Sequence, residues 1–345
     1  MRVVLVTGGT GELGTLVVQR LVAGGDQVRV LTRHRAQRDL RPQRRGKITA
    51  PSQSADQPSW MTSGSAAVQL VIGDLSTGVG LRDALDGVDA VMHCATDARK
   101  AKAVDVEGTR RLLTAAASSD RPHLVYVSIV GVDRIPLGYY KAKLAAEQLI
   151  EASGLPFTIQ RATQFPSLIQ ALLAAQSRLP VLLCLRGVRF QPVDPAEVAD
   201  RLVQHLSSGQ LGRAPDMGGP QVILMADLAR SWLITTGRRR AVLPVPVPGQ
   251  LGQAFRSGAN LCPAQAVTVR AAEQIPCTTS ATSVGHPRGL RLAATAGLAL
   301  AVLGTAGLVL LTLVIKRADE PVLLPGLVAA ISVQPPTGAT AGSAA

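Results

Sequence analysis

The chain has 345 residues, of which 47% are hydrophobic and only 3% aromatic, and its formal net charge is +13 at pH 7. This length allows one large α/β domain, or two smaller ones, with a sizeable buried core. The four cysteines lie far apart without CxxC or Cys/His spacing, which argues against a disulfide framework and a zinc site. The five histidines form no ligand pattern, so we expect no metal centre.

Residues 1–35 have the pattern of a strand, a glycine-rich turn, a helix and a second strand. Arg2–Val6 is a β-branched run, Leu13–Ala23 has apolar residues at helical spacing, and Gln27–Leu31 alternates like a strand. Glycines in such a turn allow a tight bend, let the backbone approach a pyrophosphate and let the helix pack closely. The predicted NAD(P)-binding residues of this unit are Thr7, Gly8, Gly9, Thr10, Gly11, Glu12, Leu13 and Gly14.

Strand and helix patterns go on alternating as far as residue 160. Because helices separate the strands, we expect right-handed crossovers and a parallel, doubly wound sheet, which is the Rossmann-type α/β fold. The predicted strands are Val68–Ile72, Val88–His93, Leu124–Ser128 and Leu155–Gln160, and the predicted helices are Leu81–Leu85, Val104–Ala117 and Lys141–Ala152.

The end of the second strand favours NADP over NAD. An NAD site usually has an acidic residue here for the ribose 2′-hydroxyl, whereas this chain has Arg33 and no carboxylate before Asp39. We therefore predict that Arg33 pairs with the 2′-phosphate of NADP, with NAD still possible. Asp74, after the third strand, is expected beside the adenine. Further predicted cofactor contacts are Leu75, Ala95 and Thr96.

Several segments, in this order, resemble the atypical or extended short-chain dehydrogenase/reductases, close to the NmrA-like NAD(P)-binding proteins. The resemblance covers residues 1 to about 255, apart from an insertion after the second strand. The segments that carry it are Thr7–Gly14, Gly73–Leu75, Asp105–Leu113, Tyr126–Ser128, Tyr139–Glu147 and Gly154–Phe165.

The resemblance implies a catalytic serine, tyrosine and lysine, which are Ser128, Tyr139 and Lys143 in this chain. Tyr139 and Lys143 are four residues apart and share one helix face. Lys143 would hold the cofactor ribose and lower the pKa of Tyr139, the general acid or base, while Ser128 would bind the substrate oxygen. The implied reaction is hydride transfer between NADP(H) and a small carbonyl or alcohol.

Two other functions stay open. The chain is also compatible with a non-catalytic NAD(P) redox sensor or assembly protein that acts on a partner protein. A nucleotide-sugar epimerase or dehydratase would have the same fold, but no diagnostic sugar-binding run is present.

The remaining segments define the predicted domain organisation. The NAD(P)-binding domain is expected to span 1–258, with a basic, disordered insertion at 34–67 and a substrate-side region at about 163–258. The insertion has no interleaved aromatic residues, so we expect no nucleic-acid binding; a solvated loop or attraction to anionic lipid fits it. In the substrate-side region, Asp194 is expected to cap a helix reaching Leu206, followed by helix Ala226–Thr235 and strand Val242–Val247. Substrate specificity is expected around Thr163, Gln164 and Phe165.

Beyond residue 258 we predict a linker at 259–291 and a transmembrane helix at 292–315. Leu292–Ile315 contains no charge and is long enough to span a bilayer as a helix. Residues 316–345 are expected to form a disordered tail. The predicted arrangement is a cytoplasmic domain held at a membrane by a C-terminal helix.

Overall fold

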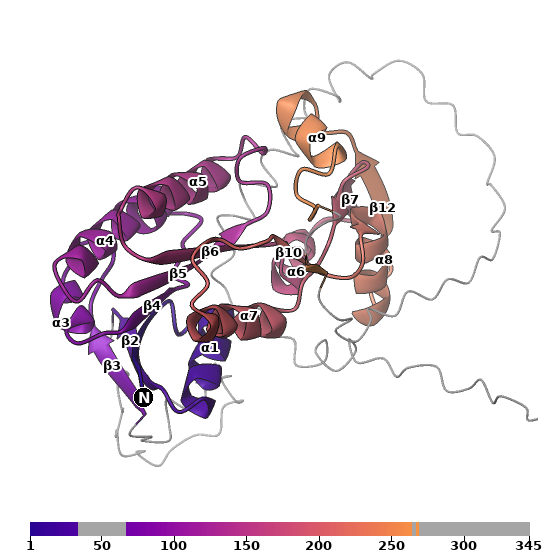
Figure 1. Cartoon of the computed structure of the whole chain (residues 1–345). Coiled ribbons are helices and arrows are strands. Elements are labelled where there is room, and N and C mark those ends of the chain that lie inside the picture. The colour runs from indigo at the N-terminus through magenta and orange to yellow at the C-terminus, as the bar shows by residue number, and fades with distance from the viewer. Residues whose placement is uncertain (34–66, 264–266, 269–345) are drawn as a thin grey trace, which may run out of the picture.

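Short β-branched runs alternate with helices in the first half of the chain and assemble into a parallel sheet (Figure 1). The structure, a computed structural model, describes residues 1–33, 67–263 and 267–268. To residue 162 its elements are β1 (Val3–Thr7), α1 (Glu12–Ala23), β2 (Gln27–Thr32), β3 (Val68–Ile72), α3 (Leu81–Leu85), β4 (Ala90–His93), η1 (Lys102–Gly108), α4 (Thr109–Ala117), β5 (His123–Ile129), α5 (Gly138–Glu151) and β6 (Phe157–Ala162). These strands lie in the order β3-β2-β1-β4-β5-β6 and all pair in parallel. The predicted Rossmann-type sheet is confirmed.

Helices cover both faces of this sheet (Figure 1). On one face α1 packs beside α7 (Pro195–Ser208), and Val17, Val18 and Leu202 enter the same apolar cluster. On the other face, α3, α4 and α5 contribute Leu85, Leu112 and Ile150 to a second cluster. Apolar contact on both faces explains why the strands are continuous apolar runs in the sequence.

The predicted helix Val104–Ala117 differs from the structure in its first part. Lys102–Gly108 forms a π-helix, η1, and the α-helix α4 starts only at Thr109. Asp105 lies in this wider turn and is only 1% exposed. π-turns are rare and often occur at functional sites, and the position of Asp105 described below agrees with that tendency.

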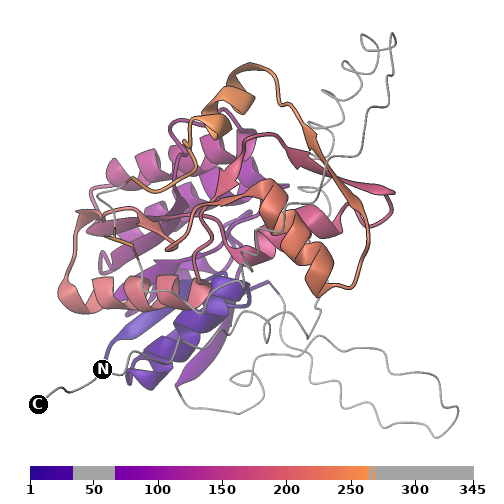
Figure 2. The ribbon, with the colours of Figure 1, turned by 90° about the vertical axis from the view of Figure 1, so that its right-hand side faces the viewer.

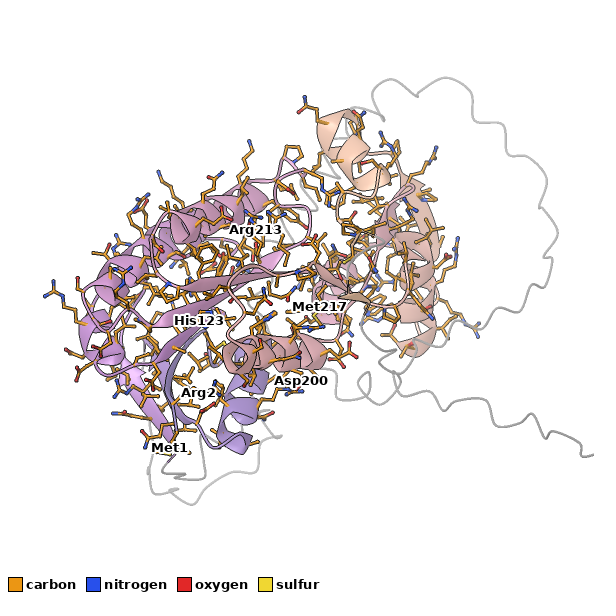
Figure 3. The ribbon with its side chains drawn as sticks, viewed as in Figure 1. Met1, Arg2, His123, Asp200, Arg213 and Met217 are labelled. Atoms are coloured by element: carbon orange, nitrogen blue, oxygen red, sulfur yellow. The ribbon has the colours of Figure 1, made fainter. Side chains whose placement is uncertain are left out.

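A buried ion cluster fixes α5 to the sheet. The carboxylate of Glu147, which is fully buried, accepts hydrogen bonds from Arg161 on β6 at 2.9 and 2.6 Å. Arg213 on β9 (Gly212–Arg213) approaches the same carboxylate at 3.0 Å and also binds Glu151. Figure 3 shows Arg213 between α5 and the sheet. Because Glu147 has no access to water, its charge must be compensated inside the protein, by these arginines and also by the nearby charge of Lys143.

Residues 166–193 and 223–262 form a second unit, the small lobe, to the right of the sheet in Figure 1. Its elements are α6 (Pro166–Ala174), β7 (Val181–Leu185), β8 (Arg189–Phe190), β11 (Ile223–Leu224), α8 (Met225–Thr235), β12 (Ala241–Val245) and α9 (Gly249–Arg256). β7 pairs with β12 in parallel, and β8 pairs with β11 in antiparallel orientation. Leu182, Cys184 and Trp232 are in its core. The predicted helix and strand of this region are confirmed, with shifts at their ends.

Residues 194–222, between the two segments of the small lobe, and residues 267–268, after them, pack with the main sheet. Asp194 caps α7 as predicted, because its side chain accepts a hydrogen bond from the backbone N–H of Ala196 at 2.8 Å. β10 (Met217–Gly218) pairs with β6, and β13 (Val267–Thr268) pairs with β10. The predicted linker from residue 259 is therefore wrong in its first part: Ala259 and Asn260 are buried and β13 joins the sheet.

Four predicted segments lie wholly or mostly outside the described residues. They are all but the last residue of the insertion at 34–67, most of the linker at 259–291, the membrane helix at 292–315 and the tail at 316–345. In the part of the chain that the structure does describe, no helix combines the length and apolar character needed to span a membrane.

Candidate cofactor site and active site

The glycine turn after β1 leaves no room for side chains at two of its positions. Gly8 has φ +70°, and a Cβ there would lie 2.7 Å from the backbone of Ala95. A Cβ on Gly14 would lie 2.1 Å from the carbonyl oxygen of Gly8. The backbone of α1 therefore approaches the turn as closely as the sequence predicts for a dinucleotide site.

The start of α1 supplies donors for a phosphate. Gly11 is the N-cap residue and has no side chain to accept hydrogen bonds from the first turn, so N–H groups there can face a ligand. The Glu12 carboxylate is engaged elsewhere, since it accepts a hydrogen bond from Ser167 of α6 at 2.5 Å. Thr10 is exposed, whereas the side chain of Leu13 is buried in the core. The residues of this turn fit a pyrophosphate held by backbone groups.

Arg33 and Asp74 lie at the same end of the sheet, after β2 and β3. Arg33 is exposed. Burial tends to raise the pKa of Asp74, but hydrogen bonds from Ser76 and the charges of Arg33 and Lys100 lower it. Arg33 is therefore near enough to act on Asp74, at the edge where the adenosine half of a dinucleotide is expected. The side chain of Leu75 is buried in the apolar core.

A buried chain of hydrogen bonds runs beneath the turn through His93. Burial, with the charge of Lys143, lowers the pKa of His93 to about 3, so the imidazole is neutral. Thr109 donates to the carbonyl oxygen of Asp105 at 2.6 Å, and its hydroxyl must then accept from Nε2–H of His93 at 2.9 Å. Nδ1 in turn accepts from Thr7 at 2.7 Å. The side chain of Thr7 is therefore held in one orientation beneath the glycine turn.

Thr96 connects Tyr139 to Asp105. The Thr96 hydroxyl donates to Oδ1 of Asp105 at 2.6 Å, and the Tyr139 hydroxyl lies 2.8 Å from the same Thr96 oxygen. Because the only hydroxyl proton of Thr96 is used on the carboxylate, Tyr139 must be the donor in the second bond. Burial and the charge of Asp105 raise the pKa of Tyr139 above its ordinary range, although the bond to Thr96 opposes this. The phenol is thus protonated at neutral pH.

Lys143 is directed to Asp105 and the sheet. Its Nζ donates to the carbonyl oxygen of Val127 at 2.9 Å, lies 3.7 Å from Oδ1 of Asp105 and is 4.3 Å from the centre of the Tyr126 ring. Burial lowers the pKa of Lys143, and Asp105 opposes that change. Within the described residues, no hydrogen bond joins Lys143 to Tyr139.

Ser128 is placed less favourably than the other two predicted catalytic residues. It lies at the end of β5, on the same face of the strand as Tyr126, and is 3% exposed. Its hydroxyl is enclosed and has no hydrogen-bond partner among the described residues. Tyr139 and Lys143 are therefore connected through Asp105, while Ser128 stands apart from this network.

Two features of the site differ from what the sequence indicates. Asp105 was not predicted as a site residue, although it is at the centre of the network; a carboxylate in a buried helical turn is the one available signal. Thr163 and Gln164, expected near the substrate, are only 4% exposed. Thr163 donates to the carbonyl oxygen of Gln191, and Gln164 to that of Asn260, so both side chains hold the lobe against β6.

Comparison with known proteins supports the cofactor site. Residues 8–167 match a family model described as NAD(P)H-binding. The photosystem II assembly factor Ycf39 of Trieres chinensis is 28% identical over 204 residues, which are 56% of this chain and 56% of that protein. The chain therefore spans about half the length of this curated relative.

Solved structures share the fold. The NADPH-dependent quinone oxidoreductase QOR2 of Escherichia coli, complexed with NADPH, superposes with a TM-score of 0.53 at 17% identity and covers 74% of this chain and 87% of its own. A dTDP-glucose 4,6-dehydratase of Bacillus anthracis in complex with NAD gives 0.55 at 15% identity, covering 72% and 86%. At such low identity these likenesses show the fold alone. The family match and the glycine turn together show that residues 8–167 form an NAD(P)H-binding domain.

Proposed function

We propose that this protein is an NADP(H)-dependent oxidoreductase that reduces a small carbonyl compound, with Tyr139 as the proton donor. The observation that carries the proposal is the direction of the hydrogen bonds at Tyr139, whose hydroxyl donates to Thr96 while Thr96 donates to Asp105. The cofactor, held by Gly8–Gly14 and Arg33, supplies the hydride. Tyr139 supplies the proton to the substrate oxygen.

The environment of Tyr139 keeps its phenol protonated, which is the form that acts in the direction of reduction. A general base must lose its proton easily, whereas burial and Asp105 raise the pKa of this phenol. A protonated phenol is the form needed to donate to a carbonyl oxygen as negative charge develops there. Lys143 is paired with Asp105 and does not reach Tyr139, so its charge does little to lower the pKa of the phenol.

A second candidate is a non-catalytic NAD(P)-binding protein that acts on a partner. Two observations favour it: the Ser128 hydroxyl is enclosed, and the relative Ycf39 is an assembly factor. In that case the hydrogen-bond network around Asp105 would only stabilise the backbone beneath the bound cofactor. The two candidates differ in turnover.

The test is NADPH oxidation by the purified protein with a panel of quinones and small carbonyls, in parallel with NADPH titration. We expect Tyr139→Phe to lower kcat about 100-fold or more while the Kd for NADPH stays the same. Tyr140→Phe is the matched control, since the neighbouring hydroxyl is outside the network, and its kcat should change by less than about threefold. An unchanged rate in Tyr139→Phe contradicts the proposal, and NADPH binding without any turnover favours the non-catalytic candidate.

We also propose that residues 292–315, which lie outside the described residues, hold the protein at a membrane with the NAD(P)-binding domain in the cytoplasm. The support is the uncharged run Leu292–Ile315 followed by Lys316 and Arg317. A chain ending near Gly285 should leave the membrane fraction, whereas the full chain should stay in it. Equal fractionation of both contradicts this anchor.

A further inference from the structure

The small lobe has charges of almost one sign. Its two segments, 166–193 and 223–262, contain no lysine, no glutamate and one aspartate, Asp227. Asp227 is paired with Arg230 at 2.5 Å. The arginines of the lobe are Arg178, Arg186, Arg189, Arg230, Arg238, Arg239, Arg240 and Arg256. The lobe therefore presents strong positive charge with almost nothing of its own to neutralise it.

Several of these arginines are used within the lobe. Arg240 donates to the carbonyl oxygens of Gln176 and Ser177, and thereby holds the connection before β7 against the connection before β12. Arg238 lies over the Trp232 ring, 5.2 Å from its centre. Three others are exposed, and their side chains make no hydrogen bond or ion pair with any residue that the structure describes. These are Arg178, Arg186 and Arg239, of which Arg186 uses only its backbone N–H, which donates to the carbonyl oxygen of Val245.

An aliphatic sheet face lies between these free arginines. Leu182 and Cys184 of β7 are fully buried toward α8, so the alternate residues point to the opposite face. The parallel register places Val181 beside Ala241 and Leu183 beside Leu243 on that face. Leu243 is 46% exposed, and Leu179, just before β7, is 38% exposed. We call Val181, Leu183, Ala241 and Leu243 the aliphatic face.

The free arginines stand at both ends of the aliphatic face. Arg178 and Arg239 precede β7 and β12, and Arg186 follows β7 directly. Figure 1 places β7, β12 and α8 on the side of the molecule away from β1–β3, and Figure 2 looks onto that side. This surface therefore lies away from β2 and β3, although Tyr139 packs against the core of the same lobe.

We propose that the aliphatic face and its arginines dock on a lipid surface that contains anionic headgroups. Aliphatic side chains gain free energy by entering the acyl boundary, and arginines bind lipid phosphates in forked geometry. Two copies of the same face would bring like charges together, which argues against self-association. The face lacks the aromatic side chains that nucleic-acid surfaces use and the polar hydrogen-bonding groups typical of a protein interface. The inference does not depend on residues 292–315.

The test is hydrogen exchange of the full chain with vesicles of phosphatidylcholine alone and of phosphatidylcholine with phosphatidylglycerol. We expect slower exchange in 177–186 and 238–245 only with the anionic vesicles, and loss of this protection at high salt. The double variant Arg178→Ala/Arg239→Ala should need about 30-fold more anionic lipid for half-maximal protection. Arg82→Ala, which removes an exposed arginine of α3, is the matched control and should behave like the parent protein.

Hydrogen exchange in 177–186 and 238–245 shows whether the small lobe itself contacts the lipid or whether another segment attaches the protein to the vesicle. Attachment to anionic vesicles without protection of 177–186 and 238–245 would overturn the proposal, and so would equal protection by zwitterionic vesicles. Protection that depends on protein concentration without lipid would instead assign the face to a second copy. Protection at all concentrations without lipid would assign it to a segment of this chain, and either result overturns lipid docking.

Discussion

The NAD(P)-binding domain and the small lobe use their charged groups in different ways. In the domain, Glu147 and Asp105 are buried and bound to Arg161, Lys143 and Thr96. In the lobe, the arginines stay at the surface or bind backbone carbonyls. Buried charges must be compensated inside the protein, whereas exposed charged side chains without an internal partner can bind another molecule. The comparison thus indicates where a substitution should alter stability and where it should alter binding.

The largest expected effect concerns the close packing at the glycine turn of the domain. Gly14→Ala forces a Cβ to within 2.1 Å of the Gly8 carbonyl oxygen, so the backbone of α1 must move. We expect a loss of about 3–5 kcal/mol in the free energy of unfolding and no measurable NADPH binding. Gly24→Ala is the control, because its Cβ would meet nothing closer than 3.4 Å. Urea denaturation and NADPH titration of both variants check this, and a stable, NADPH-binding Gly14→Ala protein would contradict the packing argument.

The ion pairs of the two regions give the next contrast. Glu147→Gln removes the charge that compensates Arg161 and Arg213 inside the domain, and we expect it to cost about 3–5 kcal/mol. Asp227→Asn breaks the exposed pair with Arg230 in the lobe, and should cost less than about 1 kcal/mol. Thermal or urea unfolding measures both. If the two variants lose the same free energy of unfolding, burial of the ion pair does not set its contribution to stability, and the contrast between the two regions is wrong.

Acid should destabilise the domain through its buried histidines. Burial lowers the pKa of His93 to about 3, and burial with the charges of Arg201 and His123 lowers that of His205 to about 4. In the unfolded chain both histidines have the ordinary pKa near 6.5. Between that pKa and the lower pKa of the folded state, the unfolded chain binds more protons than the folded chain. The free energy of unfolding therefore falls as the pH decreases below about 6.5. Each such histidine contributes a slope of up to about 1.4 kcal/mol per pH unit.

Urea unfolding between pH 7 and pH 5 measures this slope. Carboxylates with raised pKa values, such as Glu12 and Glu197, act in the opposite sense at lower pH, which is why the window ends at pH 5. His205→Gln should lose about a third to a half of the slope, because burial also lowers the pKa of His123. Stability that stays constant down to pH 5 would mean that these imidazoles are not held neutral.

The order of elements in the domain could be predicted because its signals are local. The spacing of apolar residues marks each strand and helix, and the turn Gly8–Gly14 marks the cofactor site. The helical cap at Asp194 follows from one residue type at one position. These features depend on neighbours in the chain; the elements and the cap are confirmed, and the cofactor contacts of the turn stay a prediction.

The network at Tyr139 could not be predicted in the same way. Thr96 lies in the loop after β4, Asp105 in η1 and Tyr139 in α5, so they meet only in the folded chain. The π-turn at Lys102–Gly108 leaves the apolar spacing of a helix nearly unchanged. The pairing of β7 with β12 joins segments separated by α7 and much of the lobe, so nothing local indicates it. Its consequence, an aliphatic face between arginines, was missed for that reason.

The most direct test of the NADP-dependent account is calorimetric titration of the full chain with NADPH and NADH, repeated on Arg33→Ala. Arg33 is exposed at the end of β2, and we propose that it binds the 2′-phosphate. We predict that NADPH binds at least about tenfold more tightly than NADH and that Arg33→Ala removes this preference while leaving NADH affinity unchanged. Arg82→Ala should retain the preference. Equal affinity for the two cofactors in the parent protein, or an Arg33→Ala variant that still prefers NADPH, would contradict the account.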